Sequence, residues 1–459
     1  MINKFNNLEK FLLIIVALSG SLIFFFPIQY LFIGLVVLAS LLYLLANPKI
    51  CFYLILITSP FFVGGFRMSE GSGLPFNQSD ILITICFLGL FFRNIFTSQI
   101  NKVSIRTKID LWLIVLFILH LFFGFNSISH RGYQGFLRYG EIAATFYMTI
   151  YFLRTKEVKL SELVKVIIFV GLFEALYGIL QSLTGSLGAN FQSTRGYLGY
   201  LGIGSSLVWH GQGSFPHFNS LGPFLNLIFL FFLPINYFIA KDKRRGYIIL
   251  AILFFGVVTT YSRGSLLALI VGILFFKFQT ISKKSGFLMK LTPLALFIFM
   301  AMKFLKNTSY VNTISPRNEL WAIAITSITS SPKNFFFGSG LQSYLDAIHM
   351  LIPANVLPTQ YLNYVSHNFI LYYAVEMGII GAGSIVLFLI NNLVYAYKCM
   401  QTNNLIIKVI SSSITLIIVS FFIEGMFDTA FNQFNTQIWL YIILGLLYAK
   451  TPKLLTKNI

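Results

Sequence analysis

The sequence predicts an all-α integral membrane protein, a polytopic bundle of about 12–14 transmembrane helices with one larger extracytoplasmic loop. Composition is the first observation: 57% of the 459 residues are hydrophobic, 17% are aromatic and only 10% are charged. Soluble domains are about 45–50% apolar and about 25% charged. The second observation is that apolar runs recur from Phe11 almost to the C-terminus with no long polar block between them. Residues 1–459 are therefore interpreted as a single membrane domain.

The predicted spans follow from the length of the apolar runs. A helix needs about 20 residues to cross a hydrocarbon core about 30 Å thick. Runs of roughly that length stand at 9–26, 30–46, 50–63, 81–97, 110–126, 136–153, 162–183, 218–240, 247–261, 264–279, 288–304, 379–398, 405–425 and 436–449. The runs 50–63 and 436–449 are the shortest, which is why the predicted count is a range.

The net charge of +19 points to the membrane and not to nucleic acid. A nucleic-acid-binding surface gathers its basic residues in one patch or stripe, whereas here they alternate with apolar spans. With a cytoplasmic N-terminus, most of the 33 lysines and arginines fall in cytoplasmic loops, including the run 241–245. The positive-inside rule then places both termini in the cytoplasm.

No metal or other cofactor is expected. Cys51, Cys86 and Cys399 lie in or beside apolar spans, without CxxC or paired-histidine spacing. The outer segments hold few acids and neither DxD nor HExxH, so a carboxylate cage for a divalent ion is not predicted.

Two outer segments are long enough to hold structure. Residues 184–217 are rich in Gly and Ser and predict an irregular loop. The large extracytoplasmic loop, 305–367, contains "SPRNELWAIAITSITSSP", which predicts a helix with Ser315 as N-cap, Pro316 at its first position and an end at Ser331-Pro332. Gly338 and Gly340 in "FFFGSGLQSY" predict a tight turn.

Arg263 in "TTYSRGSLLAL" falls where one span ends and the next begins on the outer side. One interpretation is a snorkelling arginine at the end of a helical hairpin. The other is an outer-facing ligand for an anionic lipid, because Ser262 and Gly264 leave the backbone beside it accessible. Both remain open from the residues alone.

His367 opens the run "SHNFILYYAVEMGIIGAG", in which Ser366 is the expected cap and His367 and Asn368 the first helical residues. A helix N-terminus disfavours imidazolium, so a neutral imidazole that can accept a proton is one interpretation. A polar helix start at the membrane interface is the other.

Four further polar residues are candidates for substrate contact. Arg317 suits bidentate phosphate binding or is an ordinary solvated loop cation. His217 and Asn219, at the outer mouth of the span 218–240, fit turn chemistry and substrate contact equally. Arg195 is another basic residue on the outer side.

Three acids fall within or at the edge of spans and are functional candidates for that reason. They are Glu141, Glu174 and Glu424. Glu141 lies three residues after Arg138, so the two share a helix face and are expected to neutralise one another.

These motifs, in this order, resemble the O-antigen ligase and polymerase superfamily of bacterial membrane glycosyltransferases. The resemblance rests on "GSFPHFNSLGPFL", "TTYSRGSLLAL", "RNELW", "GSGLQSY" and "SHNFILYYAVEMGIIG", and it covers residues 160–450. It implies a GT-C-like membrane fold in the bacterial cytoplasmic membrane. The active site would face the periplasm.

The resemblance also implies the chemistry. Members transfer a glycan from an undecaprenyl diphosphate-linked donor to a sugar or a lipid A-core-type acceptor, with membrane lipids around them. By motif, Arg263 and Arg317 would hold the diphosphate, and His367 would activate the acceptor hydroxyl. The further candidates for substrate contact, His217, Asn219, Asn368 and Arg195, are not assigned by the motifs, and the chemistry is expected to be metal-free. Ligase and polymerase activity both fit, and the alternative from a different class is a membrane transporter of a small anion or glycan-related substrate.

Overall fold

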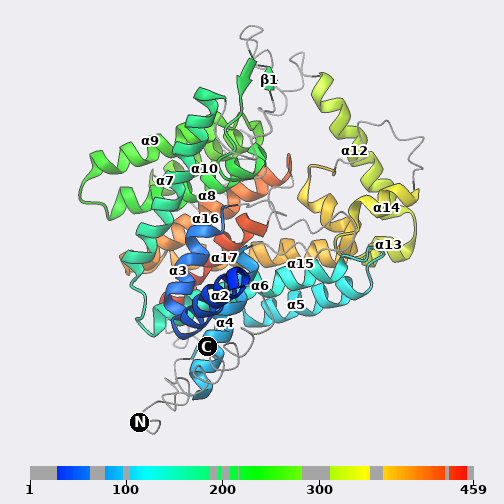
Figure 1. The fold of residues 1–459 in the computed structure, drawn as a ribbon. Helices are drawn as coiled ribbons and strands as arrows, with labels where there is room; N and C mark the ends of the chain where they lie inside the picture. Colours follow the sequence, from blue (N-terminus) through cyan, green and yellow to red (C-terminus); the bar gives the residue numbers. More distant parts are fainter. Residues whose placement is uncertain are drawn as a thin grey trace, which may run out of the picture.

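The chain is an all-α polytopic membrane protein (Figure 1). The computed structural model describes residues 28–61, 78–96, 104–185, 195–197, 207–215, 217–281, 311–351, 365–428 and 434–451. Its elements are α2 (Ile28–Ala46), α3 (Pro48–Thr58), α4 (Gln78–Phe96), α5 (Asp110–Phe125), α6 (Gly132–Arg154), α7 (Leu160–Thr184), β1 (Arg195–Tyr197), β2 (Leu207–Trp209), α8 (Phe218–Phe238), α9 (Lys243–Thr259), α10 (Arg263–Ile281), α12 (Val311–Thr329), α13 (Pro332–Phe337), α14 (Tyr344–Leu351), α15 (Phe369–Cys399), α16 (Leu405–Gly425) and α17 (Phe434–Lys450).

Every predicted span that falls on described residues corresponds to a helix. Among those residues, six helices are long and apolar enough to cross a membrane, or up to seven if the bent pair α2–α3 counts as one span. The predicted spans 9–26 and 288–304 lie outside the described residues. The total of about 12–14 spans therefore stays a prediction.

The predicted span 50–63 corresponds to α3, which has 11 residues and is sharply bent against α2. The two corresponding helices, α2 and α3, are long and apolar enough to cross a membrane only when taken together, and they are bent by 108° relative to one another. The cause lies in the residue order, because Pro48 takes a first-turn position of α3 and a proline disfavours helical geometry in the residue before it.

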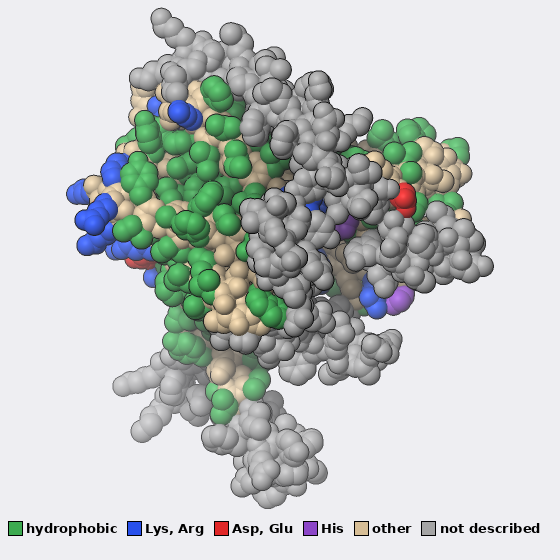
Figure 2. Space-filling model, turned by 90° about the horizontal axis from the view of Figure 1, so that it is seen from above, with side chains coloured by type: hydrophobic (Ala, Val, Ile, Leu, Met, Phe, Trp, Pro, Cys, Tyr) green, Lys and Arg blue, Asp and Glu red, His purple; other side chains and the backbone are tan. Residues whose placement is uncertain are grey.

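The centre of the bundle consists of α8, α16 and α17. In the apolar stretches of α8 and α16, 78% and 83% of the residues are buried inside the protein. The corresponding share is 39% in each of α4, α7 and α10. A helix that is hydrophobic all round belongs in an interior, whereas the outer helices leave apolar side chains for lipid. Figure 2 shows hydrophobic side chains over much of one such face.

One break interrupts α15. Gly378 has φ +61° and ψ −172° inside it, so the part after the break corresponds to the predicted span 379–398. The predicted turn at 338–340 is confirmed and packs on this break, since Gly338 (φ +67°) and Gly340 (φ +101°) have positive φ. A Cβ on Gly338 would lie 2.5 Å from the backbone nitrogen of Gly378. The close crossing of these two segments therefore requires glycine at both positions.

The helix predicted from Pro316 begins earlier than expected. It is α12, which starts at Val311 and ends at Thr329, so the predicted end is confirmed and the predicted cap at Ser315 is wrong. Pro316 is the sixth residue of this helix, so one turn forms before the proline, although a proline at that position cannot donate an intrahelical hydrogen bond. Ser331 instead caps α13, because its hydroxyl accepts the backbone N–H of Asn334 at 3.1 Å.

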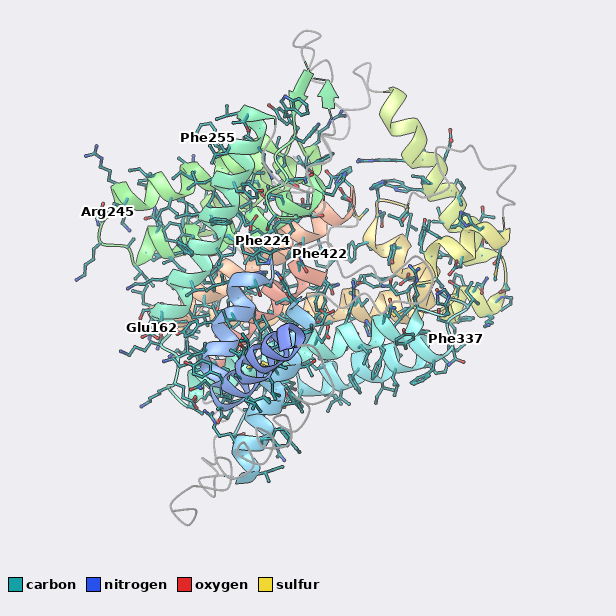
Figure 3. The ribbon with its side chains drawn as sticks, in the orientation of Figure 1. Glu162, Phe224, Arg245, Phe255, Phe337 and Phe422 are labelled. Carbon is teal, nitrogen blue, oxygen red and sulfur yellow. The ribbon has the colours of Figure 1, made fainter. Side chains whose placement is uncertain are left out.

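The molecule has two distinct ends. Figure 3 labels Arg245 and Glu162 toward one end and Phe337 at the other, and basic side chains gather at the first end in Figure 2. Lys398, Lys408 and Lys450 likewise lie near the ends of α15, α16 and α17 that are opposite to Phe369, Gly425 and Phe434. The candidate site lies at the latter ends.

Candidate functional site

Arg263 is the first residue of α10, directly after a tight turn. α9 ends at Thr259, and the turn that follows contains Tyr261 with φ +52°. The carbonyl of Ser262 accepts the N–H of Leu266 at 3.0 Å, which makes Ser262 the N-cap of α10. Arg263 is exposed there, so an anion beside it would also face the positive end of the helix dipole.

A buried polar network fixes this turn from below. Asn226 of α8 donates to the carbonyl of Ser265 at 2.8 Å and to Glu424 Oε2 of α16 at 3.4 Å. The Ser265 hydroxyl donates to Glu424 Oε1. All three side chains are buried, and the network ties α8, α10 and α16 together beneath Arg263.

The segment before α8 clamps the turn from outside. His210 Nδ1 donates to the carbonyl of Thr260 at 2.9 Å, and the N–H of Gly211 donates to the carbonyl of Thr259 at 2.8 Å. Glu174 holds the same segment by accepting from the backbone N–H and the hydroxyl of Ser214, at 2.9 and 2.6 Å. Glu174 and Glu424 thus have structural partners at the site.

His367 lies against Asp428, which follows the end of α16. Their Nδ1 and Oδ1 atoms are 3.3 Å apart, and the two side chains are 23% and 11% exposed. A carboxylate only accepts hydrogen bonds, so Nδ1 carries the proton in this pair. In the neutral tautomer with the proton on Nδ1, Nε2 carries the lone pair that a general base requires.

The cap of α15 differs from the expected one. Asn368 is the N-cap, since its Oδ1 accepts from the N–H groups of Ile370 and Leu371 at 3.0 and 3.1 Å. The Ser366 hydroxyl donates to the carbonyl of Asn368, so the prediction that Ser366 caps this helix is wrong. His367 stands before the helix with φ +47°, a left-handed conformation that takes the imidazole off the helix surface.

His217 and Asn219 form the start of α8. His217 is the N-cap, and its Nδ1 accepts the N–H of Asn219 at 3.1 Å. Loss of solvation in the surrounding protein lowers the pKa of His217, the negative charge of Asp428 raises it, and His210 and His367 lower it further. His217 therefore has the predicted role in the turn that starts α8. Its electrostatic interactions with Asp428 and His367 indicate that it lies near that pair.

Arg317 faces the same place from α12. Burial lowers the pKa of Arg317, Asp428 raises it and Arg263 lowers it, which identifies both groups as electrostatic neighbours. Trp321, one turn later, donates from its indole N–H to the carbonyl of Ser366 at 2.7 Å. This bond fixes α12 against the residue that precedes His367.

The structure therefore brings most of the predicted site residues together. His367 contacts Asp428, Arg317 and His217 are electrostatic neighbours of Asp428, and Arg263 is an electrostatic neighbour of Arg317. The starts of α8, α10 and α15 converge here; Figure 3 labels Phe224 and Phe422 in the adjoining parts of α8 and α16. Arg195 lies in β1 opposite Trp209, and its side chain is outside the described residues.

Asp428 was missed in the sequence. The signal was present, because an acid directly after an apolar run on the acid-poor outer side is unusual for this chain. Its sequence distance from His367 concealed the pairing.

The surroundings of Glu141 differ from the predicted ones, in which Arg138 alone neutralises it. No ion pair within 4.0 Å joins the two among the described residues, and Asp80 is a second close neighbour of Glu141. The Arg138 guanidinium lies 5.4 Å from the ring centroid of Phe434, so Arg138 faces α17.

Comparison with known families agrees with the order of the motifs. Residues 248–389 match the O-antigen ligase family, a segment that contains Arg263, Arg317 and His367. No curated protein matches the chain. The matched segment confirms the resemblance predicted from the sequence over residues 248–389, about a third of the chain.

Proposed function

We propose that this protein transfers a glycan from an undecaprenyl diphosphate-linked donor to an acceptor sugar at the outer face of the bacterial cytoplasmic membrane. The observation that carries the proposal is a histidine–aspartate pair with Arg317 as an electrostatic neighbour and Arg263 near Arg317. Arg263, Arg317 and His367 all fall within the segment that matches the O-antigen ligase family. A diphosphate needs cations, and an acceptor hydroxyl needs a base. The site supplies both.

Arg263 and Arg317 hold the diphosphate in this mechanism. Guanidinium groups bind phosphate oxygens in a bidentate manner, and the N-terminus of α10 adds backbone N–H groups and its dipole. When the bond between the anomeric carbon and the diphosphate breaks, negative charge grows on the leaving oxygen. The two arginines stabilise that charge, which is the role that a divalent metal plays in other transferases, and the proposed reaction needs no metal.

His367 acts on the acceptor. Its Nε2 takes the proton of the acceptor hydroxyl while the hydroxyl oxygen attacks the anomeric carbon, and the electron pair of the broken C–O bond leaves with undecaprenyl diphosphate. Asp428 orients the imidazole and stabilises the imidazolium that forms. A single displacement of this kind inverts the anomeric configuration.

The proposed membrane orientation follows from charge. Basic residues lie at the helix ends opposite to the site, and the positive-inside rule assigns such ends to the cytoplasm. The site then faces the periplasm, where lipid-linked glycans are joined to a lipid A-core-type or other sugar acceptor. Ligase and polymerase activities use the same displacement and differ in the acceptor.

Glycan analysis in the native host tests the proposal. A deletion strain is complemented with wild type, Arg263→Ala or His367→Ala at matched membrane levels, and both variants are expected to lose transfer. Single repeat units attached to the acceptor indicate a polymerase, and full-length polymer retained on the lipid carrier indicates a ligase. Normal glycan in either variant contradicts the proposed site and favours the transporter or another role.

A further inference from the structure

A polar cavity lies in the bundle, outside the residues assigned to transfer. Its volume is about 70 Å³, and it is partly open. Side chains of α5, α6, α15 and α17 surround it, with Leu341 and Gln342 of the outer loop on one side. Figure 1 shows α5, α6 and α15 running side by side in this region. The volume has room for about five water molecules.

Glu376 supplies a hydrogen-bond acceptor to this cavity. It is 1% exposed and stands two residues before the break at Gly378. Its Oε1 has no hydrogen-bond partner among the described residues, although the carboxyl group interacts with the Tyr372 side chain and with the backbone N–H groups of 342–344. A buried polar atom without a partner is costly, so a donor on a bound molecule would stabilise this site.

The other polar groups of the cavity donate hydrogen bonds or both donate and accept them. Arg138 lies over the ring of Phe434, and Gln437 donates to the hydroxyl of Tyr373 at 3.0 Å. One cation and one acid line the same space, so neither a diphosphate nor a simple cation is matched to it. A lipid tail would leave these groups without partners. A neutral molecule with several hydroxyl groups satisfies both kinds of group.

Aromatic rings supply the remaining walls. Phe388 and Tyr441 stack at 5.7 Å with an interplanar angle of 15°, and His120 and Tyr139 stack at 4.2 Å and 16°. Aromatic walls with a few placed polar groups are typical of small-molecule sites. A sugar ring presents both surfaces that such walls need, C–H groups on its faces and hydroxyl groups at its edge.

We propose that this cavity binds one neutral sugar unit of the glycan substrate by one edge of its ring. The proposal rests on the proposed function, because it takes the molecule that reacts at His367 to be a glycan. Tyr373 and Glu376 lie in α15, five and eight residues after its N-cap Asn368, which is about 8–12 Å of helical rise beyond the end of the helix that His367 precedes. The bound unit is therefore not the reacting sugar but another unit of the donor or acceptor chain.

Direct binding to the full chain in detergent micelles without sugar headgroups tests the proposal. The probe is the oligosaccharide repeat unit, released by mild acid from the lipid-linked fraction of the native host and free of diphosphate, titrated by saturation-transfer NMR. Glu376→Gln keeps the shape and removes the charge, and we expect about tenfold weaker binding. Tyr441→Phe should weaken binding a few-fold, whereas Tyr448→Phe, its matched control two turns along α17, should not. The Tyr448 hydroxyl donates to Asn392 at 3.0 Å, away from the cavity.

The outcomes separate this proposal from the proposed function. No binding to wild type, or equal binding to wild type, Glu376→Gln and Tyr441→Phe, overturns the sugar site and leaves the cavity filled with water. Arg263→Ala should abolish transfer and keep binding of the probe. If wild type shows no transfer but binding depends on Glu376, the transfer proposal fails and the sugar site stands. In transfer assays, a raised KM for the acceptor or for the donor in Glu376→Gln identifies the chain that the cavity holds.

Discussion

Asp428→Asn tests the assignment of His367 as the base most directly. The substitution preserves size at a side chain that is 11% exposed and removes the acceptor that lies 3.3 Å from His367 Nδ1. An amide can donate to Nδ1, which favours the tautomer with the proton on Nε2, and that tautomer cannot accept a proton from the acceptor. General base catalysis contributes about 10²–10⁴-fold, so kcat should fall by a factor in that range.

The effect on donor binding should be different. Asp428 is a negative neighbour of Arg317, and its loss increases the positive charge that faces a diphosphate. The KM for the lipid-linked donor should therefore stay the same or decrease while kcat falls. The assay is transfer by the full chain in lipid nanodiscs with donor and acceptor varied separately, with exposed Asp346→Asn of α14 as the control.

A double substitution makes the test stricter. Residues that act as one unit are not additive, so Asp428→Asn combined with His367→Gln should be no slower than His367→Gln alone. A kcat for Asp428→Asn within about threefold of wild type would refute the reasoning. So small a loss would mean that the His367–Asp428 pair does not supply the general-base contribution of about 10²–10⁴-fold.

Four more expectations follow from the described contacts. Arg263→Lys should raise the KM for the donor about tenfold or more, because lysine cannot form a bidentate phosphate contact; a donor titration measures it, and an unchanged KM excludes direct diphosphate binding. Trp321→Phe removes the bond to the Ser366 carbonyl, worth about 1 kcal/mol, and should lower kcat several-fold while thermal stability falls only slightly; equal kcat would show that this bond does not position Arg317 and His367. The pKa of His217 is lower in the folded chain than the unfolded value of about 6.5, so its contribution to stability is complete above that value and decreases as the pH falls below it; unfolding temperatures at descending pH should fall more for wild type than for His217→Asn, and parallel curves would contradict this. Gly378→Ala would bring a Cβ to 2.3 Å from the backbone of Phe336 at φ +61°, so the yield of folded protein should collapse, whereas Gly383→Ala, with nothing within 4 Å of its added Cβ, should be tolerated; equal yields would disprove the close crossing.

Local patterns predicted most of the helices, because apolar length and glycine or proline position act within a single segment. The turn at Gly338 and the start of α10 at Arg263 belong to this class. The bend before 50–63 also had a local signal, since Pro48 interrupts the helix that precedes it. The error at the start of α15 arose because Ser366 and Asn368 are both good caps, and the choice depends on which side chain reaches the free N–H groups.

The pairing of distant residues was not accessible in the same way. Asp428 and His367 are 61 residues apart, and Asn226 and Glu424 are 198 apart. Their contacts depend on how α8, α10, α15 and α16 pack, which the apolar pattern of each helix does not specify. The cavity beside Glu376 depends on four helices at once and left no motif in the sequence.

The arrangement of Arg263 and Arg317 has a consequence for turnover. These cations, with the start of α10, would contact the same diphosphate before and after the glycosidic bond forms, so the spent lipid carrier would be held by the contacts that held the loaded one. Interactions that are equal in two states give no help in passing from one to the other. Undecaprenyl diphosphate is then expected to compete with the donor, and sustained synthesis would depend on how quickly a lipid diphosphate phosphatase removes the spent carrier from the membrane.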